Sequence, residues 1–174
     1  MKYIALLRGV TPTGQNKIPK MSYLREILID AGFPTVKTYL QSGNLLLNTD
    51  LSSVDASVII HDCIKQKIGA DLSVIMKQPH QLQTAVMECP FDDTYDSTRI
   101  HLVFSNDVID RYKLEQVSSR VYEGEEFAIG SECMYLYLPR DAAKKVLHTN
   151  YLERKLGITA TMRKLSVIRH LCEA

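Results

Sequence analysis

The chain has 174 residues, of which 45% are hydrophobic and 24% are charged. These values are typical of a globular protein with a buried core and argue against a disordered chain. The sequence contains no run of about 18 apolar residues that could span a bilayer, and the short apolar segment 3–7 lacks the cleavage site of a signal peptide. We therefore expect a cytoplasmic protein without a membrane partner.

Charge is unevenly distributed along the chain, although the net charge is only +1. Segment 88–132 carries eleven acidic and four basic residues, whereas segment 140–174 carries eight basic and three acidic residues. Segment 8–25 carries four basic residues and no acidic residue. This asymmetry leaves a basic face for anions, unless the segments neutralise one another in the folded protein.

The first half of the chain alternates between strand and helix patterns. The apolar spacing predicts a strand at 3–7, a helix at 21–31, strands at 35–40 and 45–48, a helix at 54–68 and a strand at 72–76. Ser53 is the expected N-cap of the second helix. Residues 41–44 are expected to form a tight hairpin turn in which Gly43 and Asn44 adopt positive φ. The resulting order is βαββαβ, the ferredoxin-like arrangement.

A similar pattern follows an expected short helix at 81–87 and an acidic link. It predicts a strand at 100–104, a helix at 109–118, strands at 126–129 and 133–138, and helices at 142–156 and 164–172. Gly130 and Ser131 are expected to form a type II′ turn. The second half thus has the order βαββα followed by a terminal helix. We predict an α+β fold with two ferredoxin-like halves, residues 1–90 and 91–174, mainly antiparallel sheets and a C-terminal helix.

Motifs of common enzymes and cofactor sites are missing from the sequence. It contains no GxSxG, HExxH or GxGxxG motif, and its four cysteines and five histidines are dispersed without a zinc-like spacing. Gly9 and Gly14 have the spacing of the first two P-loop glycines, but Gln15 stands where the lysine is needed. We therefore predict no metal and no cofactor, and the sequence names no catalytic residue.

Two polar segments are candidate binding elements. The loop after the first strand contains Arg8, Gly9, Gly14, Asn16 and Lys17, and the hairpin turn contains Gln41, Ser42, Gly43 and Asn44. A loop that leaves a strand and leads to a helix can direct backbone N–H groups at a phosphate or carboxylate. The alternative interpretation is that the glycines serve turn geometry and the polar side chains satisfy the loop backbone.

Three segments of the chain resemble the bacterial domain-of-unknown-function family numbered 1697. These segments are Tyr3-Ile4-Ala5-Leu6-Leu7-Arg8-Gly9, Asn16-Lys17-Ile18-Pro19 and Thr38-Tyr39-Leu40-Gln41-Ser42-Gly43-Asn44. The resemblance continues to the segment 161–163, where Arg163 matches the family pattern. It implies a small bacterial cytoplasmic protein with a duplicated α+β architecture and no assigned activity. The chain departs from the family where 10–14 reads Val-Thr-Pro-Thr-Gly, since Pro12 offers no N–H.

The sequence leaves three functional classes open. The first is binding of a small anionic ligand by the loop and the turn, with Arg163 as a further cation. The second is nucleic-acid binding through a basic C-terminal face, where Tyr135 and Tyr137 alternate onto one side of a strand. The third is an enzyme that acts on a small anionic substrate through Arg8, Lys17 and Arg163. The oligomeric state is not predicted.

Overall fold

The computed structural model describes residues 1–174 and divides into two compact units, Met1–Pro79 and His80–Ala174. We call them unit 1 and unit 2. The division falls at the start of helix α3 (Pro79–Met87), whereas the sequence analysis placed it after this helix. Helix α3 is attached within unit 2, because the Tyr135 hydroxyl donates a hydrogen bond to the Ala85 carbonyl.

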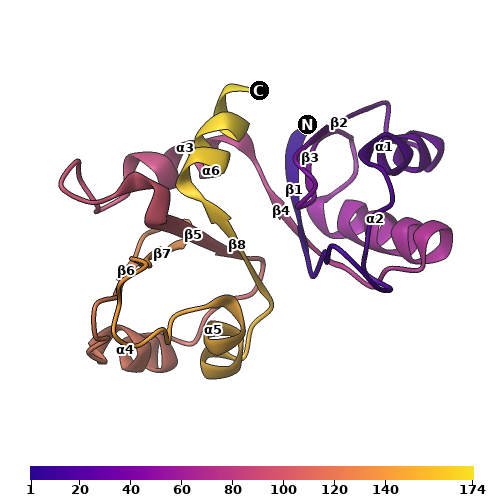
Figure 1. Cartoon of the computed structure of the whole chain (residues 1–174). Helices are drawn as coiled ribbons and strands as arrows, with labels where there is room; N and C mark the ends of the chain where they lie inside the picture. Colours follow the sequence, from indigo (N-terminus) through magenta and orange to yellow (C-terminus); the bar gives the residue numbers. More distant parts are fainter. The chain divides into compact units, whose positions relative to one another are not determined.

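Unit 1 has the predicted βαββαβ order. Its elements are β1 (Lys2–Arg8), α1 (Met21–Asp30), β2 (Thr35–Tyr39), β3 (Asn44–Asn48), α2 (Ser53–Ile68) and β4 (Ser73–Lys77). The strands form one antiparallel sheet in the order β2-β3-β1-β4. Both helices cover the same face of this sheet (Figure 1), where Leu24, Ile60 and Leu45 are fully buried in one hydrophobic cluster.

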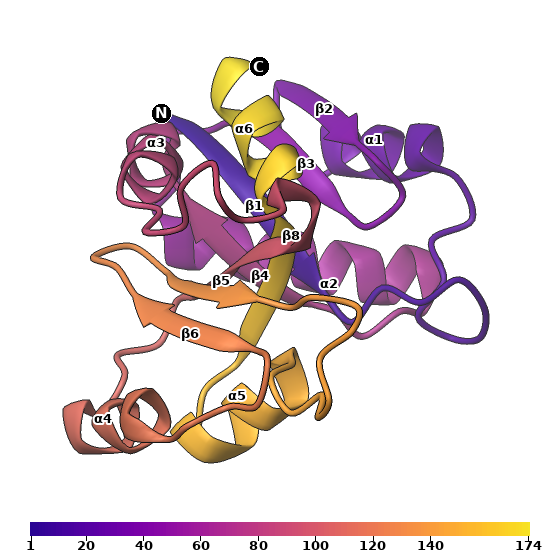
Figure 2. The ribbon, with the colours of Figure 1, turned by 60° about the vertical axis from the view of Figure 1, so that its left-hand side comes forward.

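Unit 2 repeats this strand order in a second antiparallel sheet, β6-β7-β5-β8. After α3, its elements are η1 (Ser97–Arg99), β5 (Ile100–Ser105), α4 (Arg111–Ser119), β6 (Glu126–Ile129), β7 (Met134–Tyr137), α5 (Thr149–Leu156), β8 (Ala160–Lys164) and α6 (Leu165–Glu173). Helices α4 and α5 lie on one side of the sheet, and α3 and α6 lie on the other, as Figures 1 and 2 both show. The fold class predicted from the sequence is confirmed, including the C-terminal helix.

Strand β8 was missed by the sequence analysis and completes βαββαβ in unit 2. It pairs with β5, with Ser105 opposite Ala160 and His101 opposite Lys164. Its polar residues Thr161 and Arg163 are buried, and the guanidinium of Arg163 donates to the Thr161 hydroxyl at 2.6 Å. Residues 160–163 do alternate apolar and polar side chains, as a strand does, and the structure buries Ala160 together with the polar Thr161 and Arg163.

The predicted helix at 142–156 was wrong over its first half. Helix α5 begins at Thr149, and residues 142–148 form a connection. The buried Glu125 carboxylate accepts hydrogen bonds from the backbone N–H groups of Val146 at 2.7 Å and Leu147 at 3.0 Å. These two amides are therefore not available for helical hydrogen bonds, and the His148 side chain caps the shorter helix by accepting from the N–H of Tyr151.

Two local predictions also differ from the structure. The N-cap of α2 is Ser52 rather than Ser53, and its hydroxyl accepts from the N–H of Asp55. Gly130 does not have the positive φ required at the first central position of a type II′ turn. A glycine is needed there for another reason, because a Cβ would lie 2.6 Å from the Tyr135 ring.

Candidate functional site

The loop between β1 and α1, residues 9–20, is held against the connection between α2 and β4. The Asn16 side-chain oxygen accepts a hydrogen bond from the N–H of Asp71 at 3.1 Å, and the Gln15 side chain donates to the Gly69 carbonyl at 3.2 Å. Within the loop, the N–H of Thr11 donates to the Asn16 carbonyl at 3.2 Å. The loop after the first strand therefore has a defined shape, which its polar side chains help to set.

The hairpin turn between β2 and β3 lies beside this loop, as a single binding site made of both segments requires. The Gln41 side chain donates to the Ile18 carbonyl at 2.8 Å, and the N–H of Leu7 donates to the Gly43 carbonyl at 2.9 Å. Two separate sequence segments thus meet where strand β1 ends. The side chain of Gln41 joins them through its hydrogen bond to the Ile18 carbonyl, in the loop before α1.

The turn uses its own side chains to close its backbone. The buried Asn44 amide donates to the Tyr39 carbonyl at 2.8 Å and to the Ser42 hydroxyl at 3.1 Å. The residues with positive φ are Leu40 and Gly43, not Gly43 and Asn44 as predicted. Asn44 starts strand β3 instead. Gln41 and Asn44 consequently act on the backbone of this region, which is the alternative that the sequence had left open.

The tip of the loop keeps groups that are not used inside the protein. The backbone N–H groups of residues 13–16 make no hydrogen bond within the protein, and Gly14 has a left-handed φ of 83° with open space around its Cα. Lys17 is exposed and forms no ion pair. Arg8 is half-buried at the end of β1, where it pairs with Ser73 across the sheet. Successive N–H groups in a turn can bind an anion.

Arg163 belongs to unit 2, and unit 1 contains the other nine predicted site residues. Arg163 is only 7% exposed, and burial lowers the pKa of its guanidinium to about 10. The guanidinium also donates to the Met162 carbonyl at 3.0 Å. In this position, Arg163 stabilises the backbone and side chains of β8.

The two tyrosines of the nucleic-acid hypothesis are not presented together on a free surface. Tyr135 is fully buried, with its hydroxyl on α3. Tyr137 packs against Tyr95, with ring centroids 4.8 Å apart, and against Phe91 at 5.8 Å. Base stacking needs an accessible ring face, so β7 does not provide the expected aromatic platform.

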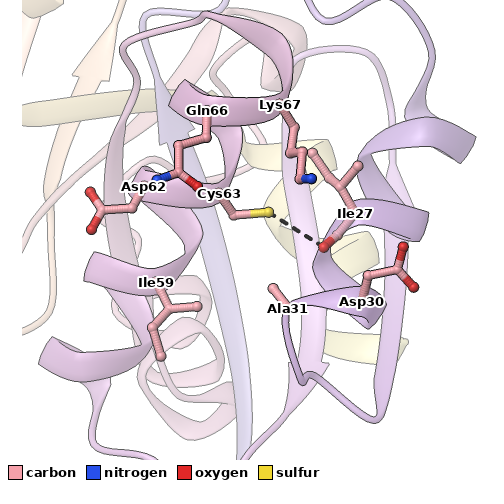
Figure 3. Close-up of a pocket in the computed structure, with 8 residues that line it drawn as sticks. All are labelled: Ile27, Asp30, Ala31, Ile59, Asp62, Cys63, Gln66 and Lys67. Atoms are coloured by element: carbon pink, nitrogen blue, oxygen red, sulfur yellow. Dashed lines mark hydrogen bonds between the residues drawn. The ribbon is translucent and has the colours of Figure 1, made fainter.

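A groove lies between α1 and α2 (Figure 3). Its volume is about 370 Å³, and it is lined by Ile27, Asp30, Ala31, Ile59, Asp62, Cys63, Gln66 and Lys67. The Cys63 thiol points across the groove and donates to the Ile27 carbonyl at 3.3 Å. Burial raises the pKa of this thiol. Because a nucleophilic cysteine needs a lowered pKa, Cys63 has the character of a packing residue.

Two histidines have shifted pKa values with structural causes. His61 lies between two carboxylates, 2.8 Å from Asp71 and 3.1 Å from Asp62, and its hydrogen bond to Asp71 is the main cause of its raised pKa. Burial lowers the pKa of His101 in β5. No three His, Cys, Asp or Glu side chains gather in a geometry that could hold a metal ion.

Two comparisons relate the chain to known proteins. The sequence model of DUF1697, described as a protein of unknown function, matches residues 1–135. The solved structure of the conserved bacterial protein SP0830 from Streptococcus pneumoniae matches with a TM-score of 0.76 and 18% identity, over 99% of this chain and 97% of that chain. At this identity the likeness concerns the fold alone. No curated protein matches the chain.

The structure contains no helix long and apolar enough to cross a bilayer.

Proposed function

Since the chain belongs to the DUF1697 family of proteins of unknown function, its function has to be argued from its own residues, and we propose that it binds a small anionic ligand through the loop after β1. The binding groups are the backbone N–H groups of residues 13–16 together with the ammonium of Lys17. Arg8, at the end of β1, adds positive charge next to the loop. Gln41 and Asn16 act as positioning residues.

A single observation carries this proposal. Four successive backbone N–H groups, those of residues 13–16, form no hydrogen bond within the protein and are followed by an exposed lysine without an ion pair. No acidic residue occurs between Arg8 and Arg25, and the carboxylate of Asp71, whose N–H donates to Asn16, is bonded to His61. Hydrogen bonds from N–H groups to an anion are charge-assisted and stronger than those to a neutral acceptor. A phosphate or carboxylate group is therefore the chemistry that suits the loop.

The cytoplasm is the proposed location. It is supported by the four cysteines, all of which are free thiols, as is usual in a reducing compartment.

A titration with inorganic phosphate, followed by the backbone amide resonances of the purified protein, tests the proposal. The amide signals of Gly14, Gln15 and Asn16 should shift in a saturable manner. Lys17→Ala should weaken binding at these amides by about tenfold, the effect of one lost charge-assisted contact. Because Lys17 is exposed, the melting temperature should stay close to that of the wild type.

The matched control is Lys20→Ala, which removes an exposed lysine of the same segment outside the loop tip. It should bind phosphate like the wild type. Equal weakening in both variants would reduce the effect to general surface charge and contradict a defined site. A shift caused by short RNA but not by phosphate would favour the nucleic-acid alternative instead.

A further inference from the structure

A second cavity lies in unit 2 between α4 and α5, helices that are adjacent in both views (Figures 1 and 2). Its volume is about 370 Å³, and it is lined by Lys113, Gln116, Val117, Ser119, Arg120, Tyr151 and Lys155. Lys113 and Gln116 are spaced by three residues on α4, and Tyr151 and Lys155 by four on α5, so each pair lies on one helix face. Three of the seven lining residues are cationic and none is acidic.

The guanidinium of Arg120 is held in place by two tyrosines. It lies 5.5 Å from the ring centroid of Tyr122 and 5.7 Å from that of Tyr151, and it donates to the Tyr151 hydroxyl at 3.1 Å. The Tyr122 hydroxyl donates to the Val117 carbonyl at 2.8 Å. Its oxygen must therefore accept from the Tyr151 hydroxyl, 3.1 Å away. The chain of hydrogen bonds runs from Arg120 through both phenols to α4 and fixes the cation at the cavity.

None of the cavity's three cations forms an ion pair with a carboxylate. Three acidic groups of the neighbouring segments accept hydrogen bonds from backbone N–H groups instead. Asp110 accepts from the N–H of Lys113 at 2.9 Å, and Glu153 accepts from the N–H of Ala160 at 3.1 Å. Glu125, which lies close enough to Tyr122 to affect its pKa, accepts from the amides of residues 146 and 147. The positive charge of the cavity is thus left for a group from outside.

The C-terminal end of α5 explains part of this charge. Arg154 and Lys155 lie in its last turn, where cations interact favourably with the helix dipole. Arg120 lies after the end of α4, at its C-cap, and faces the tyrosines. The C-terminal ends of α4 and α5 therefore favour Arg120 and Lys155, but they do not account for Lys113 in the first turn of α4, nor for the amide and the hydroxyl around the same cavity.

We propose that the cavity between α4 and α5 binds the phosphate group of a small phosphate monoester. Arg120 is suited to bind two phosphate oxygens, because its planar fork matches phosphate geometry and its side chain is already ordered. Lys113 and Lys155 supply ammonium groups from the two helices, and that of Lys155 lies 6.0 Å from the ring centroid of Tyr151. Gln116 and Ser119 supply uncharged hydrogen-bonding groups for the ester part. The cavity volume lies within the range of about 300–1,000 Å³ that is usual for small-molecule sites.

This site goes beyond the loop proposed above, because it lies in the other unit and shares no residue with it. The amide resonances separate the two sites within one phosphate titration. Binding between α4 and α5 should shift the amides of Gln116, Ser119 and Tyr151, whether or not those of the loop tip respond. Failure at one site leaves the result at the other site intact.

The decisive variant is Lys113→Gln combined with Lys155→Gln, which removes two exposed cations and leaves the buried tyrosines untouched. Phosphate and glycerol 3-phosphate should each bind this variant about a hundredfold more weakly than the wild type, roughly tenfold for each lost charge-assisted contact. Tighter binding of glycerol 3-phosphate than of inorganic phosphate by the wild type would identify the ester as the ligand class. The reverse order would identify free phosphate and overturn the ester assignment.

The charge-matched control is Lys144→Gln combined with Lys145→Gln, two exposed lysines of the same unit that do not line the cavity. It should bind like the wild type. Equal weakening in both double variants, or an absence of saturable shifts in the wild type at millimolar phosphate, would overturn the proposal. A response to single-stranded RNA but not to either phosphate compound would also overturn it, in favour of a nucleic-acid partner.

Discussion

At the residue scale, Gly43 shows how one position joins backbone conformation to packing. It has a φ of 85°, and a Cβ at this position would lie 2.8 Å from the Cβ of Leu7. Its carbonyl also accepts the N–H of Leu7. The glycine is thus required both for the left-handed conformation and for the close approach of the turn to β1.

Gly43→Ala should lower the free energy of unfolding by about 2–5 kcal/mol. Roughly 1–2 kcal/mol comes from forcing an alanine into the left-handed region, and about 1–3 kcal/mol comes from the overlap with Leu7. Urea denaturation followed by circular dichroism measures this loss. The matched control is Gly69→Ala, since Gly69 has a φ of 83° but open space around it. It should lose only about 1–2 kcal/mol, and an equal loss in both variants would show that the contact with Leu7 does not matter.

Sequence patterns could predict that the loop and the turn are polar, but not which polar atoms remain available to a ligand. In the sequence, Asn16, Gln41 and Lys17 are all polar residues that can donate hydrogen bonds to a ligand. Their amides are bonded to the backbone of residues 71 and 18, positions that only the folded chain brings near. The cavity between α4 and α5 was missed for the same reason. Arg120 and Tyr151 are 31 residues apart and form no local motif.

At the element scale, local periodicity predicted every helix and strand of the βαββαβ order of unit 1, because that unit buries apolar residues at regular spacing. The two errors of unit 2 have different causes. Strand β8 is five residues long and has a local alternating pattern, Ala160 and Met162 with Thr161 and Arg163, that the prediction of a helix from 164 onward did not use. Residues 142–148 have helix-favouring alanines and lysines, yet their conformation depends on a carboxylate from the segment before β6. Intrinsic propensity yields to tertiary hydrogen bonds in this segment.

Glu125→Ala tests the importance of that carboxylate. The variant leaves the N–H groups of Val146 and Leu147 without their acceptor, and each unsatisfied buried donor costs about 1–3 kcal/mol. We expect a loss of about 2–6 kcal/mol in the free energy of unfolding, measured by urea denaturation, and faster hydrogen exchange of these two amides. Glu125→Gln keeps a carbonyl acceptor and should lose only about 1 kcal/mol. Unchanged exchange in Glu125→Ala would mean that the connection does not depend on Glu125.

At the scale of the whole molecule, the chain uses one topology twice. Both sheets are antiparallel and have equivalent strand orders, β2-β3-β1-β4 and β6-β7-β5-β8. An internal duplication would produce this repetition, and the duplication itself stays a prediction. Each unit has a hydrophobic cluster of its own between its sheet and the two helices inserted in its βαββαβ order. Separate cores of this kind predict that stability is partly local to each unit.

Native-state hydrogen exchange of two core variants tests this independence. Leu152 in unit 2 and Leu24 in unit 1 are both fully buried, each within the cluster of its own unit. Leu152→Ala should cost about 2–5 kcal/mol through lost burial and a residual cavity, and the loss should appear in the protection of the amides of β5 and β7 while those of β1 and β3 keep theirs.

Leu24→Ala is the reciprocal variant, and it should reduce protection in β1 and β3 alone. If each substitution instead lowered protection equally in both sheets, the two units would unfold as one cooperative body. The two units would then have separate folds but would not unfold independently. Independent responses would mean that a ligand bound between α4 and α5 raises the stability of unit 2 without changing that of unit 1, since a ligand stabilises only the native structure that binds it.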